Sequence, residues 1–488
     1  MSAARTPTDE QALIIQAFGT GRNLVIEAGA GAGKTSTLKM LAADAPQQRG
    51  LYVAYNKAIA DDAQRDFPGS VQCSTAHSLA YRAVGKLYRQ RLNGPRVPAR
   101  ETARILGINE GFRLGERVLA PMQLARLVME TVDRFCRSAD PEPSGYCVPK
   151  KPGMDSPEDM RDLRDVIDPL VRKAWAEIIS QDGRLKFNHD CYLKLWQLSQ
   201  PVLRTDYVLL DEAQDANPVI LDVVTRQKNA QLIAVGDRSQ AIYGWRGAVD
   251  AMDAFPGAGR LTLSQSFRFG PAIAAEANKW LTVIGARLRL TGYERIPSVL
   301  APLASPDAIL CRTNAEAISR AMAAVDAGRR VAVVGGGSEI RRLAEAAVTL
   351  KAGAGTAHPE LMAFRTWGEV QDHAENDPSG SDLKVLVNLI DKHGPDTIIA
   401  VIDSLTSESR AEVVISTAHK AKGREWGSVK IAADFREPKE QEDGTPGEIQ
   451  REEAMLAYVA VTRAKVTLDR AGLAWVDKYL PQAAGGAR

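Results

Sequence analysis

The stretch NLVIEAGAGAGKTSTL, residues Asn23–Leu38, decides the fold. An apolar strand, Leu24–Glu27, runs into a glycine-rich turn, and Lys34 and Thr35 then open a helix. Glycines let backbone N–H groups approach phosphate oxygens closely, and a helix N-terminus adds favourable partial charge. In this pattern Lys34 is expected to reach the β and γ phosphates of a nucleotide, and the Thr35 hydroxyl to ligate Mg²⁺. The predicted phosphate-binding residues are Ala28, Gly29, Ala30, Gly31, Ala32, Gly33, Lys34, Thr35 and Ser36.

A second segment, DYVLLDEAQD at residues 206–215, brings two carboxylates to the end of a strand. Its four apolar residues, Tyr207–Leu210, are followed at once by Asp211 and Glu212. Asp211 suits the Mg²⁺ shell, and Glu212 suits orienting and deprotonating an attacking water. Together with the phosphate-binding loop, this segment predicts an enzyme that hydrolyses a nucleoside triphosphate.

Short apolar runs rich in Val, Ile and Leu recur along the chain without alternating with polar residues. This pattern is typical of parallel strands covered by helices on both faces. Helix-like stretches, for example Ser36–Ala43 and Glu339–Leu350, separate the runs, so we expect doubly wound α/β layers. The runs are Asn23–Glu27, Leu51–Tyr55, Tyr207–Leu210, Leu232–Val235, Val331–Val334 and Val413–Ser416.

Two stretches depart from this succession of predicted strands and helices. Lys86–Leu195 has no comparable strand run, and its amphipathic segments Met122–Phe135 and Asp159–Ile179 predict a helical insertion. Gly353–Ser409 is irregular, with a loop followed by an expected helix at Leu383–Lys392. We therefore expect two α/β domains, each carrying one insertion.

Length and composition set wider bounds. The 488 residues correspond to about three domains, and 45% apolar with 25% charged residues excludes a disordered tail, a collagen-like fibre and a small disulfide scaffold. The net charge of 62 − 60 = +2 gives no sign of a polyanionic partner, so nucleic-acid binding would need locally concentrated basic groups. The five cysteines form no CxxC pair, and no apolar run reaches the roughly 18 residues that span a bilayer. We expect a cytoplasmic protein with free thiols and no membrane segment.

The remaining motifs resemble, in order, those of superfamily-one helicases of the UvrD/Rep/PcrA type. AVGKLYR, GREW and the short second insertion are most similar to the F-box DNA helicase branch, although an F-box-like region before the motor is not expected. The motifs that carry the resemblance, beside the phosphate-binding loop and DEAQD, are PTDEQ before Ala12, AYNKAIADDAQ from Ala54, CSTAHSLAYR from Cys73, VGDRSQAIYGWRGA from Val235, LSQSFR from Leu263, AILCRTNAEA from Ala308, STAHKAKGREW from Ser416 and EEAMLAYVAVTRAK from Glu452.

The resemblance implies two RecA-like parallel-sheet motor domains of the P-loop NTPase class, with ATP in the cleft between them and single-stranded DNA across both. Motor domain 1 is expected at 1–85 and 196–275, and motor domain 2 at 276–352 and 410–488. The helical insertion is expected at 86–195 and the short insertion at 353–409. The short insertion is too small for the regulatory subdomain of UvrD and Rep, so autoinhibition by that subdomain is expected to be absent or altered.

The resemblance also implies roles on the nucleotide side. Gln240 is expected to sense the γ phosphate, and Arg268 and Arg463 to act as arginine fingers on the transferring phosphoryl group. Ser36 stands where the UvrD type commonly has an Arg that contacts the nucleotide. The other expected nucleotide-side or coupling residues are Gln11 and Phe267, both at adenine, and Glu425 and Tyr458.

A loop with two aromatic residues, Tyr243 and Trp245, predicts a platform for DNA bases, because stacking is worth about 1–3 kcal/mol per base and tolerates any sequence. The alternative, that both are core aromatics, fits poorly beside Gly244 and Gly247. A structural role is an equal alternative for His77, and the basic run 82–100 either follows DNA or forms a solvated face. The expected DNA contacts are Asn56, His77, Tyr243, Trp245, Arg246, Thr417, His419 and Lys422.

The expected function is therefore that of a DNA-dependent ATPase, with ATP and Mg²⁺ as cofactors, that steps 3′ to 5′ along single-stranded DNA and unwinds tailed duplexes. The alternatives are an ATP-switched sensor of DNA ends, or a translocase that strips proteins from DNA with a partner effector such as a nuclease or a repair or defence factor. A monomer or weak oligomer of bacterial or phage origin, associated with the nucleoid, is expected.

Overall fold

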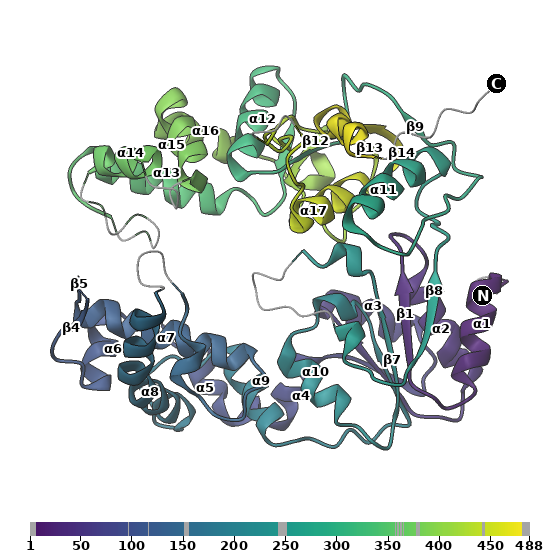
Figure 1. Ribbon diagram of the computed structural model, residues 1–488, viewed down its shortest axis with the longest axis horizontal. Helices are drawn as coiled ribbons and strands as arrows, with labels where there is room; N and C mark the ends of the chain where they lie inside the picture. The colour runs from purple at the N-terminus through teal and green to yellow at the C-terminus, as the bar shows by residue number, and fades with distance from the viewer. Residues whose placement is uncertain are drawn as a thin grey trace. The chain divides into compact units, whose positions relative to one another are not determined.

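The structure is a computed structural model of the chain (Figure 1). It describes residues 6–480 except 96, 116, 151–155, 243–250, 357, 359–360, 362–363, 365, 377–380 and 442–444. Contacts divide the chain into two units, Met1–Ala28 with Gly33–Leu263, and Gly29–Ala32 with Ser264–Arg488. We describe each unit by itself, and the bounds of the six expected segments remain a prediction.

The first unit is built on a six-stranded parallel sheet with the order β3-β2-β6-β7-β1-β8. The four strands predicted there from apolar runs are confirmed to within a residue. Two edge strands, β3 and β8, were not predicted, because partly exposed strands carry polar side chains that interrupt an apolar run. The strands are β1 (Leu24–Ala28), β2 (Gly50–Ala54), β3 (Val71–Thr75), β6 (Tyr207–Leu210), β7 (Gln231–Gly236) and β8 (Gly259–Leu263).

Helices connect these strands, as parallel pairing requires. Thr8 and Gln11 form a capping box at the start of α1, and Asn56 and Thr75 cap α3 and α4 through their side chains. Gly33, with a φ of 78°, precedes α2 and makes no side-chain cap. The helices of the first unit outside the predicted insertion are α1 (Asp9–Phe18), α2 (Lys34–Asp44), α3 (Lys57–Asp66), α4 (Ala76–Ala83) and α10 (Pro218–Thr225), with 3₁₀ turns η3 (Ala213–Asp215), η4 (Arg238–Gln240) and η6 (Ala251–Asp253).

The predicted helical insertion is helical, with one difference. Helices α7 and α8 cover the two predicted amphipathic segments, but a short antiparallel hairpin stands where no strand was expected (Figure 1). Strands of three residues are too short to show a period in the sequence. Figure 1 shows α6, α7 and α8 gathered beside this hairpin. The elements are η1 (Gly85–Tyr88), α5 (Arg89–Leu92), α6 (Ala99–Leu106), β4 (Phe112–Leu114), β5 (Arg117–Leu119), α7 (Pro121–Arg137), η2 (Gly145–Cys147), α8 (Pro157–Ile179) and α9 (His189–Leu198).

One hydrophobic core joins the insertion to the sheet of the first unit. Phe135 and Trp175 pack edge to face with centroids 5.2 Å apart, and their cluster continues to Leu51 and Val208 in the sheet. The predicted insertion is thus held to the sheet of the first unit by buried side chains.

The second unit is built on another six-stranded parallel sheet, with the order β11-β12-β10-β13-β14-β9. The predicted strands at 331–334 and 413–416 are confirmed. Strands β13 and β14 were missed, because Lys430, Lys465 and Thr467 interrupt their apolar residues. The strands are β9 (Val299–Leu300), β10 (Ala308–Cys311), β11 (Val331–Val333), β12 (Val413–Thr417), β13 (Trp426–Ile431) and β14 (Ala464–Asp469).

The short insertion contains three helices, where the sequence predicted one helix in an irregular stretch. Trp367 donates its indole N–H to Asp391 at 2.7 Å, and buried Ile398 packs in the same cluster as Ala347 of α13. Because the same cluster includes Val413 and Ile415 of β12, the short insertion shares its core with the sheet of the second unit. The helices of this unit are α11 (Pro271–Ile284), α12 (Asn314–Asp326), α13 (Ser338–Lys351), α14 (Trp367–Asn376), α15 (Ser381–His393), α16 (Pro395–Ser404) and α17 (Arg451–Val461), with η8 (Glu408–Arg410) and η9 (Ala471–Tyr479).

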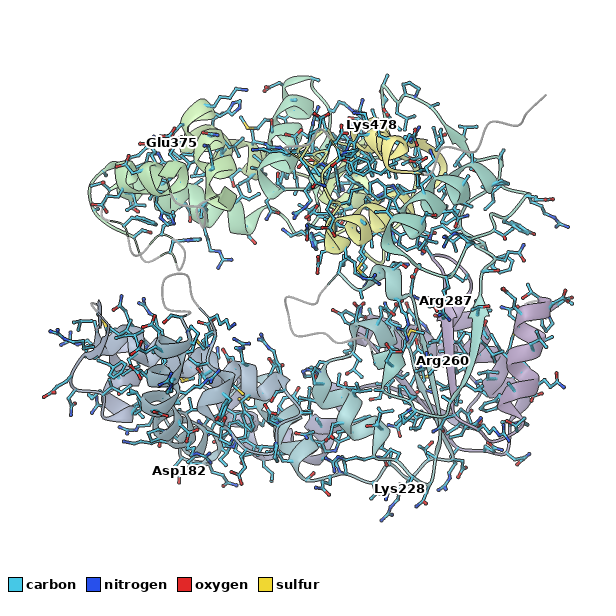
Figure 2. All side chains as sticks on the ribbon, viewed as in Figure 1. Asp182, Lys228, Arg260, Arg287, Glu375 and Lys478 are labelled. Carbon is cyan, nitrogen blue, oxygen red and sulfur yellow. The ribbon has the colours of Figure 1, made fainter. Side chains whose placement is uncertain are left out.

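Side chains cover both units, and Figure 2 labels the charged residues Arg260 and Lys478 among them. Each of these two forms an ion pair. Arg260 on β8 pairs with Asp253 at 3.4 Å, and Lys478 pairs with Glu437 at 2.9 Å. The five cysteines carry free thiols, as predicted. Among the described helices, none has the length and apolar character needed to cross a membrane.

Candidate nucleotide and nucleic-acid sites

The glycine-rich turn after β1 has the backbone that its sequence predicts. Gly31 and Gly33 have φ values of 73° and 78°, in the left-handed region that favours glycine. A Cβ on Gly31 would lie 2.6 Å from the Cβ of Arg268, and the Ala32 N–H donates to the Gly29 carbonyl at 3.1 Å. The turn is therefore closed and leaves no room for a side chain at Gly31.

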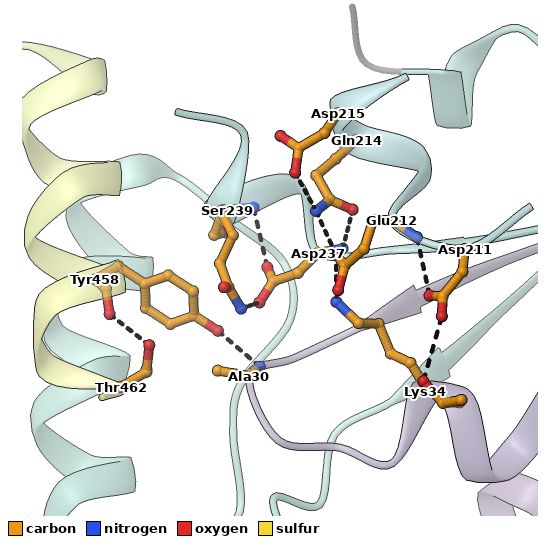
Figure 3. Close-up of polar contacts among 12 residues, drawn as sticks. Ala30, Lys34, Asp211, Glu212, Gln214, Asp215, Asp237, Ser239, Tyr458 and Thr462 are labelled. Carbon is orange, nitrogen blue, oxygen red and sulfur yellow. Dashed lines mark hydrogen bonds and ion pairs between the residues drawn. The ribbon is translucent and has the colours of Figure 1, made fainter. Parts of the chain in front are cut away.

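The two predicted chemical segments meet at one edge of the first sheet. The Lys34 ammonium lies 2.8 Å from the Glu212 carboxylate, and the Thr35 hydroxyl lies 3.2 Å from Asp211 Oδ2 (Figure 3 draws Lys34, Asp211 and Glu212). In a parallel sheet all carboxyl ends lie at the same edge, which is where ligands bind in doubly wound folds. The four residues predicted for phosphate and Mg²⁺ chemistry therefore lie together in the structure.

This cluster is buried, and its charges interact strongly. Burial, followed by the charge of Glu212, raises the pKa of Asp211, which also accepts a hydrogen bond from the Tyr52 hydroxyl at 2.6 Å. Burial lowers the pKa of Lys34, but the negative charges of Glu212, Asp211 and Asp237 outweigh it, so its pKa is raised. Lys34 therefore stays charged. A cation beside Asp211 would relieve the repulsion between the two carboxylates. Tyr52 lies within an apolar run and was not predicted as a site residue.

Glu212 has a strained backbone. Its φ of 50° is one of two positive values among the described residues other than glycine. Such a conformation costs about 1–3 kcal/mol and persists only where its surroundings impose it. The Glu212 N–H donates to Asp211 Oδ1 at 2.9 Å, which fixes the turn that directs the two carboxylates.

Gln240, the predicted phosphate sensor, lies just beyond β7, the strand between β1 and β6. It is buried and donates to Asp237 at 2.6 Å. Asp237 also accepts from the Ser239 N–H at 3.1 Å. Gln214 links this group to Glu212, and neither Gln214 nor Asp237 was singled out from the sequence. Their only signal was that each is a polar residue following a strand within a quoted motif.

Gln11 has partners other than a nucleotide. Its side-chain oxygen accepts from the Thr8 N–H at 3.0 Å, and its amide donates to the Thr37 hydroxyl at 3.1 Å. It joins the start of α1 to α2, and its expected contact with adenine remains a prediction. Ser36 lies in the first turn of α2 and is partly exposed.

The first candidate arginine finger, Arg268, is held by a carboxylate of its own unit. Its Nε donates to Glu425 at 2.7 Å, and its Nη1 donates to the Thr462 carbonyl at 3.2 Å. Burial raises the pKa of Glu425, but the charges of Arg268 and Lys465 outweigh it, so the pKa is lowered. Phe267 is 41% exposed and packs against Tyr293 with centroids 5.6 Å apart.

The second candidate finger, Arg463, is fully buried. Its guanidinium donates to the carbonyls of Val459 and Arg424, at 2.9 and 3.2 Å, and to the Thr462 hydroxyl at 3.0 Å. These contacts fix the end of α17, and its role at a phosphate remains a prediction. On the same helix, the buried Tyr458 hydroxyl accepts from the Ala30 N–H at 3.1 Å (Figure 3).

The predicted DNA contacts are placed less completely. Asn56 caps α3 by accepting from the Ile59 N–H at 2.9 Å, and His77 lies 3.5 Å from Asp190 of the insertion. Thr417 is buried at the end of β12, and the partly exposed His419 and Lys422 follow it. Tyr243, Trp245 and Arg246 lie outside the described residues.

A cavity of about 570 Å³ lies in the first unit, beyond the carboxyl ends of β2, β3 and β6. Tyr55, His77 and Glu212 line it from the part of the first unit outside the insertion, and Arg137 and Asp190 line it from the insertion.

The basic run 82–100, predicted to follow DNA or to form a solvated face, contains an arginine with partners in the protein. Arg91 donates to the backbone carbonyls of Ile178 and Leu185. That arginine therefore stabilises the insertion, so the basic run is not simply a solvated face.

These features define a class of protein. A parallel sheet whose first strand leads through a glycine-rich turn to a lysine that opens a helix, with paired acids after another strand, is typical of a P-loop NTPase.

Comparison with known proteins gives the family. Residues 193–252 match the UvrD/REP helicase N-terminal domain, and residues 362–469 match the UvrD-like helicase C-terminal domain. The chain belongs to the UvrD-like, superfamily-one helicases, as its motifs indicated.

Two similar curated proteins are F-box DNA helicases, and both align over almost the whole chain. F-box DNA helicase protein 1 of Schizosaccharomyces pombe is 30% identical over 94% of this chain and 57% of its own length. F-box DNA helicase 1 of Gallus gallus is 30% identical over 96% of this chain and 49% of its own length. ATP-dependent DNA helicase PcrA of Leuconostoc citreum is 26% identical over 52% of this chain and 36% of its own length. The chain thus spans about half the length of its F-box relatives, whose organisms give no support to a bacterial or phage origin.

Proposed function

We propose that this protein is an ATP-dependent DNA helicase that steps 3′ to 5′ along single-stranded DNA. The observation that supports this most is the pairing of Lys34 with Glu212 and of Thr35 with Asp211 beyond the carboxyl ends of β1 and β6. The names of the relatives, which are DNA helicases, favour DNA as the polymer that stimulates hydrolysis.

In the proposed reaction, Glu212 orients the attacking water and accepts its proton. In the structure this carboxylate is paired with Lys34. A γ phosphate would compete for the same ammonium and release the carboxylate toward the water. A bound γ phosphate would thereby free the base that takes the proton from the attacking water.

Thr35 and Asp211 are the proposed protein ligands of Mg²⁺, which neutralises charge on the phosphates when it is bound. The described residues contain no group of three or more His, Cys, Asp and Glu suited to a metal ion. Two protein ligands completed by phosphate and water oxygens are what Mg²⁺ commonly takes in such sites. The raised pKa of Asp211 fits a carboxylate that gains from a nearby cation.

On the DNA side, we propose that the strand passes the cavity beside Tyr55 and His77. Tyr55 is 54% exposed, which suits a ring that stacks on a base. The other predicted contacts remain Asn56, Tyr243, Trp245, Arg246, Thr417, His419 and Lys422.

The test is an ATPase assay with and without single-stranded DNA, beside strand displacement on 3′-tailed, 5′-tailed and blunt duplexes. We expect DNA-stimulated hydrolysis, unwinding of the 3′-tailed duplex, and loss of both in Lys34→Ala. A rate of ATP hydrolysis that is the same with and without single-stranded DNA would refute the proposal. Stimulated hydrolysis without unwinding, together with displacement of a DNA-bound protein, would instead support the protein-stripping alternative.

A further inference from the structure

Gln214 uses its whole side-chain amide inside the first unit. Its Oε1 accepts from the Asp237 N–H at 2.9 Å, and its Nε2 donates to Glu212 Oε2 at 2.7 Å and to Asp215 Oδ2 at 3.2 Å (Figure 3). The residue is 1% exposed. An amide nitrogen carries two N–H groups, so both are used, on carboxylates of the same segment.

The orientation of this amide is fixed by its partners. The reversed orientation would put the amide oxygen against two carboxylates and the amide nitrogen against a backbone N–H. The Gln214 side chain therefore has one arrangement that satisfies every group around it.

The end of β7 is shaped to admit this amide. A Cβ on Gly236 would lie 2.4 Å from Gln214 Oε1, so any side chain at that position would displace the amide. Glycine at 236 thus permits a close approach of two neighbouring strand ends. In such a buried place a hydrogen bond is stronger than in water, and losing it is costlier.

The contacts of Gln214 join two parts of the site that differ in role. On one side, Glu212 is paired with Lys34 at 2.8 Å. On the other, Asp237 accepts from the Gln240 amide at 2.6 Å. A continuous path of side chains and one backbone N–H therefore connects the phosphate-binding lysine to the predicted phosphate sensor.

We propose that Gln214 is a positioning residue that ties the Glu212 carboxylate to the segment 237–240. When this segment shifts, Gln214 carries the shift to the carboxylate that activates water. The inference rests on the proposed function, because it assigns a path by which DNA-dependent movement of this segment reaches the hydrolytic base.

The experiment compares Gln214→Met with Gln227→Met in the full chain. Methionine keeps the length of the side chain and removes its hydrogen bonds. Gln227 is a matched control, since it is also buried in this unit and makes three bonds, to Leu203, Pro201 and Val223, away from the phosphate-binding loop. The measured quantities are kcat and KM for ATP with and without single-stranded DNA, and Kd for that DNA.

For Gln214→Met we expect the ratio of DNA-stimulated to unstimulated kcat to fall about 10- to 100-fold, the range that small misplacement of a reacting group causes. The KM for ATP and the Kd for DNA should stay unchanged, and Gln227→Met should keep the wild-type ratio. A ratio that stays at the wild-type value in Gln214→Met, or that falls equally in both variants, would overturn the inference.

A second variant tests the inference in case Gln214→Met does not fold. Gly236→Ala leaves Gln214 in place and should displace its amide, so it should give the same selective loss of stimulation. A wild-type ratio in a folded Gly236→Ala would also overturn the inference. The wild-type arm reports on the proposed function separately, because absence of stimulation there would refute the function and not the role of Gln214.

Discussion

The ammonium of Lys34 lies 2.8 Å from the carboxylate of Glu212, although β7 separates the strands that precede these residues. Neighbouring strands are about 4.8 Å apart, so the ends of β1 and β6 are about 10 Å apart. Only long side chains bridge that gap. The chemistry of this edge therefore depends on a Lys and a Glu at these positions, where shorter residues of the same charge would not meet.

The first prediction concerns the proposed base. Glu212→Gln keeps the size and the hydrogen-bonding oxygen of the side chain but cannot accept the proton of water. We expect kcat for ATP hydrolysis to fall by at least about 10²-fold, with binding of a fluorescent ATP analogue retained. Glu101→Gln, at an exposed ion pair on α6, is the control and should hydrolyse ATP normally. Normal turnover by Glu212→Gln would exclude it as the base.

The second prediction concerns Arg268. If its guanidinium stabilises the transferring phosphoryl group, Arg268→Ala should lower kcat by about 10³-fold or more. Lys carries the charge without the planar fork, so Arg268→Lys should recover little of the loss. Arg260→Ala removes an exposed arginine of β8 and should leave turnover unchanged. Steady-state ATPase assays decide this, and wild-type rates in Arg268→Ala would argue that the arginine only anchors Glu425.

The third prediction compares two glycines with the same backbone. Gly31 and Gly21 both have a φ of 73°, but a Cβ on Gly21 meets nothing within 4 Å. The left-handed conformation costs an L-residue about 1–2 kcal/mol, so Gly21→Ala should show only that loss in urea unfolding. Gly31→Ala must also move Arg268, and we expect weakened ATP binding in addition. Equal ATP affinity in both variants would show that the space at Gly31 is unimportant.

The fourth prediction concerns pH and Asp477. The hydrogen bond from Arg470, with that from Lys279, lowers the pKa of Asp477 from 3.8 to about 2. A carboxyl group whose pKa is lowered by folding stabilises the protein above its unfolded value, and that contribution disappears as pH falls through the folded value. Between pH 3.8 and about 2, the free energy of unfolding should therefore fall less steeply in Asp477→Asn than in wild type.

Urea midpoints measured at several pH values check this. Asp182→Asn, an exposed substitution in the first unit, is the control and should follow wild type (Figure 2). Parallel pH profiles for wild type and Asp477→Asn would contradict the assigned role of the ion pairs.

Much of the fold was predictable because buried parallel strands appear as apolar runs. The central strands β1, β2, β6 and β7 were found in this way, whereas the edge strands β3 and β8 were not. At the edge of a sheet one flank faces water, and polar residues such as Gln72 are then tolerated.

The site divides in a similar manner. The sequence predicted the four residues of the phosphate and Mg²⁺ cluster, Lys34, Thr35, Asp211 and Glu212. This was possible because the end of an apolar run shows which residues follow the carboxyl end of a strand. The hydrogen bond between Gln214 and Asp237 could not be predicted, because it requires β6 and β7 to be neighbours in the sheet. The order of strands in a sheet cannot be deduced from short stretches of sequence. Gln11 and Asn56 show the converse: they are motif residues that the structure shows in structural contacts, Asn56 as a cap of α3 and Gln11 as a cap of α1 that also bonds Thr37.

The core shared by α13 and the helices of the short insertion has a consequence for engineering. Trp367, Val370 and Ile398 are buried together with Ala347 of α13. Deleting residues 353–409 would expose the apolar side chains of α13 that now pack against the insertion. The shortened protein should therefore aggregate. These helices should also open together in hydrogen exchange, as one foldon. A smaller motor would require redesign of the outer face of α13 before any shortening.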